Sequence, residues 1–183
     1  MKRLNRAAII TQLIDKLHKY GSWCGETHVQ KITFILQNLM QVPLKYEFIL
    51  YKHGPFSFDL RDELTSLRAD GLIELEPQQL PYGPKIVTTS RSRNIAATCS
   101  KTIAKYNNRI DFIAKTFNDK GVTELERLAT AYFVTMVNNS VVSVDERVKQ
   151  ITKLKPHILI DNARSAVSEI DNIIMQAQHL LKQ

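Results

Sequence analysis

Apolar residues recur with the spacing of an α-helix through most of this chain. They follow the tighter spacing of a β-strand in three short segments, all before residue 90. The three segments cover 46–51, 72–76 and 85–89. A loop over 77–84, with three prolines and one glycine, separates the second segment from the third and predicts a β-hairpin. So little strand in 183 residues restricts the fold to a mainly α (α+β) class.

Local signals place three helices around the first strand. Helical stripes over 4–19 and 29–39 precede this strand, and a third stripe over 58–70 follows it. Ser57 is a suitable N-cap for the third helix, and Gly71 is a suitable residue to end it. The order helix, helix, strand, helix, strand, loop, strand is that of a winged helix-turn-helix domain, whose wing is the β-hairpin.

The second half of the chain is predicted to be helical throughout. Between 92 and 117 the apolar residues are spaced by three and four, which predicts one helix with a narrow seam: Ile95, Cys99, Ile103, Tyr106, Ile110, Ile113 and Phe117. Capping boxes are predicted at Thr27–Gln30, Thr123–Glu126 and Ser143–Glu146. Asp161 is a suitable cap for the last helix.

These patterns predict a winged-helix domain over 1–90 and a helical region over 91–183 that packs on it. The seam is predicted to pair with the last helix inside the chain. The alternative is that the seam joins two copies of the chain as a homodimer.

Composition favours a soluble protein with a polyanionic partner. The net charge is +7, and basic proteins tend to meet polyanions. No apolar run approaches the roughly 20 residues of a membrane helix. The run Ala7–Ile10 is too short for a signal peptide. Because Cys24 and Cys99 are the only cysteines, reduced thiols and a cytoplasmic location are expected.

Most of the positive charge falls in one stretch of sequence. Residues 81–115 contain seven basic side chains and one acidic side chain, Asp111. The candidate phosphate contacts in this stretch are Lys85, Arg91, Arg93, Lys101, Lys105 and Arg109. One interpretation is a DNA-binding face formed by the wing and the basic helix 91–109. The other is an ordinary solvated helix face.

The third helix is at odds with simple readout of the DNA major groove. Its exposed positions are mainly acidic, at Asp59, Asp62, Glu63 and Asp70, with Arg61 and Arg68 as the basic exceptions. Carboxylates repel phosphate, and the amino group of cytosine is their one natural partner among the bases. One interpretation is that the wing and the basic helix make most of the contacts to double-stranded DNA, with Arg61 and Arg68 assisting. The other is that the acidic residues bind a protein partner.

No residue pattern points to catalysis. Nucleotide-binding glycine loops and hydrolase motifs are absent from the sequence. Cys24 and His28 have the spacing of half a zinc site, but no second pair accompanies them. Cys24 with His28 or His53 could form a nucleophile and its base, although no orienting acid is evident. We therefore expect no enzyme activity, no metal and no cofactor.

Several segments resemble a known family. Lys31–Gln37, Tyr51–Leu60 and Asp70–Ile73 resemble the conserved core of the YwgA-like proteins, and Leu125–Ala131 with Lys153–His157 resembles their helical tail. More distantly, the chain is similar to the SocA/Panacea-type antitoxin domain. The first resemblance implies a winged-helix-like fold and no reaction. The second implies toxin binding or regulation of a toxin–antitoxin operon.

The sequence as a whole predicts a DNA-binding winged-helix protein, either a transcriptional regulator or an antitoxin-like component. The alternative is a protein-interaction module, a toxin-neutralising or defence-complex subunit that uses the acidic third helix.

Overall fold

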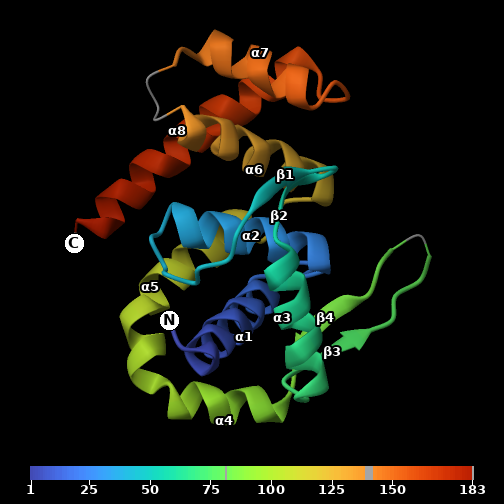
Figure 1. Cartoon of the computed structure of the whole chain (residues 1–183), viewed down its shortest axis with the longest axis vertical. Coiled ribbons are helices and arrows are strands. Elements are labelled where there is room, and N and C mark those ends of the chain that lie inside the picture. Colours follow the sequence, from blue (N-terminus) through green and yellow to red (C-terminus); the bar gives the residue numbers. More distant parts are fainter. Residues whose placement is uncertain (81, 139–141, 183) are drawn as a thin grey trace.

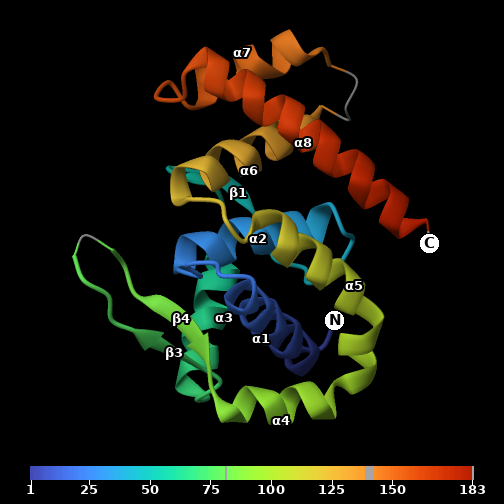
Figure 2. The same cartoon turned by 180° about the vertical axis from the view of Figure 1, so that it is seen from behind.

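The computed structural model describes residues 1–80, 82–138 and 142–182, and within them the chain folds into eight helices and two β-hairpins (Figures 1 and 2). The elements, in chain order, are α1 (Arg3–Lys19), α2 (Glu26–Asn38), β1 (Ile49–Tyr51), β2 (Gly54–Phe56), α3 (Phe58–Ala69), β3 (Ile73–Glu76), β4 (Lys85–Thr88), α4 (Ser90–Thr98), α5 (Ser100–Phe117), α6 (Val122–Val137), α7 (Val144–Leu154) and α8 (Ile160–Leu181). The mainly helical class is confirmed.

Two separate antiparallel hairpins carry all the strands of the described residues. β3 pairs with β4 as expected, with Ile73 opposite Thr88, although Pro81 of the predicted loop 77–84 lies outside those residues. The first predicted strand is shorter than expected and ends at Tyr51. After a turn at Lys52 and His53 the chain pairs back onto it as β2, a strand that the sequence pattern does not predict. Gly54 allows this turn because its φ of +87° is readily adopted only by glycine.

Local capping signals are only partly confirmed. The Ser57 hydroxyl accepts the Leu60 amide at 3.2 Å, Gly71 ends α3 with a φ of +67°, and the Ser143–Glu146 capping box is present. The boxes at Thr27 and Thr123 are wrong, since those helices start after Gly25 and Gly121 without a side-chain cap. Asp161 lies inside the first turn of α8, so it is not the cap.

The predicted single helix over 92–117 is also wrong, because the chain turns a corner at Cys99 between α4 and α5 (Figure 1). Cys99 has a φ of −99° and a ψ of 24°, outside the helical range, and its side chain is buried. The corner lets both helices pack against α1. The seam of α5 therefore pairs with α1 rather than with α8, which packs on α6 and α7.

The second half of the chain packs directly on the first. α6 lies against α2, and buried side chains from both halves belong to one continuous hydrophobic core. Phe34 of α2 is central to this contact, because its ring meets those of Tyr132 and Phe133 from α6. The boundary near residue 90 stays a prediction. Within the described ranges, no helix is both long enough and apolar enough to span a bilayer.

Candidate functional site

Helix α3 separates its charges onto different faces, which a residue count does not reveal. At 3.6 residues per turn, Leu60, Leu64 and Leu67 share one face, and all three are buried in the core. Arg61, Thr65 and Arg68 share a second, exposed face, called here the basic stripe. The acidic residues fall on the remaining side of the helix.

Arginines of α1 neutralise part of the acidic side. Glu63 is only 8% exposed and pairs with Arg3 at 3.4 Å and Arg6 at 3.3 Å. Asp70 also pairs with Arg3, at 2.6 Å. The prediction that Glu63 is an exposed docking residue is therefore wrong, because burial and the two ion pairs make it part of the α1–α3 contact. Of the four predicted acidic residues, Asp59 and Asp62 stay exposed without an α1 partner.

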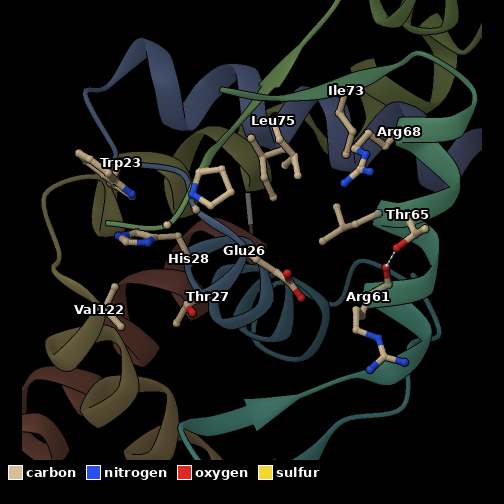
Figure 3. Close-up of a pocket in the computed structure, with 15 residues that line it drawn as sticks. Trp23, Glu26, Thr27, His28, Arg61, Thr65, Arg68, Ile73, Leu75 and Val122 are labelled. Carbon is tan, nitrogen blue, oxygen red and sulfur yellow. Dashed lines mark hydrogen bonds between the residues drawn. The ribbon is translucent and has the colours of Figure 1, made fainter. Parts of the chain in front are cut away.

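The basic stripe borders a cavity of about 360 Å³ (Figure 3). Its walls come from α3, from the β3–β4 hairpin and from the start of α2. Arg68 extends from α3 over the cavity, and no hydrogen bond or ion pair within the described residues engages its guanidinium. Arg61 turns away, because it pairs with Asp62 at 3.2 Å and stacks 5.1 Å from the centre of the Phe58 ring.

Trp23 and His28 line this cavity and also a neighbouring one of about 540 Å³. The Trp23 ring lies 5.0 Å from that of Tyr82 and 4.7 Å from the Lys85 ammonium. His28 bonds the Lys120 carbonyl oxygen through Nε2 at 3.1 Å, and since a carbonyl can only accept, Nε2 carries the hydrogen. Burial lowers the pKa of His28, which keeps the ring neutral and leaves Nδ1 as an acceptor.

The other predicted basic residues do not form one helix face. Lys85 is half-buried on β4, while Arg91 and Arg93 are exposed on α4, and Arg91 approaches the Asp70 carbonyl oxygen at 3.4 Å. Lys101 and Lys105 lie beyond the corner on α5, also exposed. In both views α4 runs between the hairpin and α5, so these cations follow a long arc (Figures 1 and 2).

Arg109 is not available to phosphate in the way the sequence predicts. Its Nη1 donates to the Met40 carbonyl oxygen at 2.9 Å and to that of Gln41 at 3.4 Å. Those carbonyls belong to the segment just after α2, and the guanidinium satisfies backbone acceptors that no described strand or helix pairs. Arg109 is therefore a structural link between α5 and α2.

The structure disfavours Cys24 as a nucleophile. The side chain is completely buried, and burial raises the pKa of its thiol to about 12. The thiol is thus protonated at neutral pH, and only the thiolate attacks efficiently. His53 faces Glu126, with 3.6 Å between Nδ1 and Oε2. Among the described residues no group of three or more potential metal ligands lies together.

Sequence reasoning missed a buried polar cluster centred on Glu126 of α6. Lys31 of α2 lies beside it, and burial lowers the pKa of Lys31 to about 8, against the attraction of Glu126. His157 contacts Glu126 at 3.1 Å. Lys155 is also buried and donates to the carbonyl oxygens of Tyr51 and Lys52. The cluster fastens the β1–β2 hairpin to the second half of the chain, and no local sequence signal joins its members.

Neither the protein-family models nor the curated proteins searched give a match to this chain. The resemblance to the YwgA-like and SocA/Panacea-type proteins therefore stays a prediction. The features that bear on function are the basic stripe, the β3–β4 hairpin and the cavity between them.

Proposed function

We propose that the chain is a winged-helix DNA-binding protein in which α3 is the recognition helix and the β3–β4 hairpin is the wing. The observation that supports this proposal most strongly is the separation of positive and negative side chains onto different faces of α3. Arg61 and Arg68 are exposed on one face, while Glu63 and Asp70 are held by Arg3 on another. The ion pairs with Arg3 therefore reduce the electrostatic repulsion between α3 and the phosphates of DNA.

The exposed basic side chains are suited to contacts with the bases and with the phosphates of DNA. An arginine in the major groove can donate two hydrogen bonds to guanine, which gives Arg61 and Arg68 a role in base recognition. Lys85 on the wing and Arg91 and Arg93 on α4 are placed for phosphate contacts, which set affinity and register. Lys101 and Lys105 extend the same surface onto α5 only if the duplex bends or is long enough to reach them. A regulator or antitoxin-like component would use such binding at an operator.

The test is a salt titration of the purified chain on random duplex DNA. With five cations in contact with DNA, affinity is expected to fall by about 10²–10³ between 50 and 200 mM salt, because each neutralised phosphate releases counterions. Fluorescence anisotropy of a labelled duplex measures this slope. Failure to bind the duplex at 50 mM salt would contradict the proposal, and so would binding that is insensitive to salt.

A second candidate function rests on the aromatic residues next to Asp59 and Asp62. Tyr51 and Phe58 are 54% and 43% exposed, and their rings contact each other and Phe56. Exposed aromatic clusters are common at protein interfaces, and the flanking carboxylates favour a basic protein as the partner.

Charge removal at Asp59 and Asp62 tests this second candidate. A basic protein that co-purifies with the tagged chain should be lost when both residues are changed to asparagine. The matched control, Asp119→Asn with Asp161→Asn, removes two exposed carboxylates elsewhere and should retain the partner. Equal retention by both variants would exclude this surface.

A further inference from the structure

The cavity between α3, the hairpin and α2 has the character of a small-molecule site. Its floor is apolar and buried, formed by Leu64, Ile73 and Ile86, and Leu75 and Val122 lie at its rim. Its volume of about 360 Å³ falls within the usual range for ligand pockets. A few polar groups converge on this apolar surface, as is typical of sites that orient a ligand.

Three of the polar groups lack the hydrogen-bond partners that an internal contact would supply, which indicates a ligand. The Arg68 guanidinium reaches over the cavity and has no partner among the described residues (Figure 3). The first amides of α2 have no side-chain cap. The Nδ1 atom of His28, in a side chain only 3% exposed, is buried without a hydrogen-bond partner in the same region. Unpaired buried acceptors are costly unless a ligand or water satisfies them.

We propose that this cavity binds a small aromatic molecule that carries one anionic group. Trp23, Pro84 and the apolar floor offer a surface for flat rings. Arg68 would hold the anion. The uncapped first amides of α2 and the Nδ1 atom of His28 would form hydrogen bonds with neutral polar groups of the ligand, an acceptor and a donor respectively. Glu26 also lines the cavity, and its carboxylate opposes a second negative charge, which limits the ligand to one anionic group near Arg68.

The proposed ligand site does not require DNA binding to be correct, but the ligand and the duplex would both use Arg68. A guanidinium that holds a ligand is withdrawn from the duplex, and the ligand would touch both the wing and the recognition helix. Occupancy of the cavity would therefore lower DNA affinity if the proposed function is correct. The ligand site itself is measured without DNA, so failure of one proposal can be told from failure of the other.

The test uses two fluorescent probes that share their ring system. 8-Anilinonaphthalene-1-sulfonate carries a sulfonate, and N-phenyl-1-naphthylamine lacks it. We expect saturable binding of one sulfonate probe per folded chain, and binding of the neutral probe weaker by about tenfold or more, because a hydrogen bond to a charged group is lost. Equal binding of both probes, or no saturable binding of the sulfonate, would overturn the proposal.

Variants locate the bound probe. Arg68→Leu should weaken the sulfonate probe by about tenfold, and Glu26→Gln should strengthen it. Thr65→Phe should block binding by filling the cavity. The substitution should leave the fold intact, because the one hydrogen bond of the Thr65 hydroxyl among the described residues goes to the Arg61 carbonyl oxygen of its own helix. The control Lys153→Leu removes an exposed cation of α7, outside the cavity, and should leave probe binding unchanged. Far-UV circular dichroism checks that each variant is folded, and unchanged binding in Arg68→Leu would place the probe elsewhere.

Discussion

Reversing the charge of the basic stripe, by Arg61→Glu with Arg68→Glu, is expected to lower the affinity for random duplex DNA by about a hundredfold or more at 50 mM salt. Each lost arginine contact to a base or phosphate accounts for about 1–3 kcal/mol, and the new carboxylates add repulsion. Neither arginine supports the core, since both side chains are exposed on α3. The unfolding free energy should therefore change little. Anisotropy of a labelled duplex gives the affinity, and urea denaturation gives the stability.

A matched variant separates the effect of the stripe from that of net charge. Lys149→Glu with Lys153→Glu makes the same change in total charge, on exposed positions of α7. α7 lies at the far end of the molecule from α4 in both views (Figures 1 and 2). This variant should lose much less affinity than the stripe variant. If both variants lose the same affinity, the DNA contact depends on overall charge, and α3 is not the recognition helix.

The charge on α3 shows what the sequence could and could not predict about the site. Its helix, its Ser57 cap and its apolar face follow from local spacing, because those signals act within a few residues. Its electrostatic character does not, since Arg3 and Arg6 reach Glu63 from about sixty residues away. A count of charges along the chain therefore overestimates the negative charge that α3 would present to DNA, because Glu63 is buried and paired.

The corner at Cys99 shows the same limit for the fold. The apolar seam keeps its helical spacing through Cys99, so periodicity alone predicts an uninterrupted helix. The chain bends there because α4 and α5 both cover α1, and burial of Cys99 and Ile110 is a tertiary requirement. The cavity is equally invisible in the sequence, because its walls come from three separate segments and from Val122 at the start of α6.

The largest effect on stability is expected from Phe34→Ala, which removes the ring that joins the two halves of the chain. Phe34 is 1% exposed, and its ring centre lies 5.2 Å from that of Phe48 and 5.5 Å from that of Tyr132. Truncation of a core phenylalanine costs about 3–5 kcal/mol, because transfer energy is lost and a cavity remains. The exposed Phe58, changed to alanine, should cost at most about 1 kcal/mol and serves as the control.

The same experiment tests whether residues 1–90 and 91–183 are separate domains. Trp23, the one tryptophan of the chain, reports unfolding of the first half by fluorescence, while far-UV circular dichroism reports the helices of both halves. If the continuous core makes the halves one cooperative unit, both probes should give the same urea midpoint, and Phe34→Ala should shift both together. Two independent domains would unfold in separate transitions. In that case Phe34→Ala would displace the fluorescence transition alone, because the helices after residue 90 would hold their structure without the aromatic contact to α2.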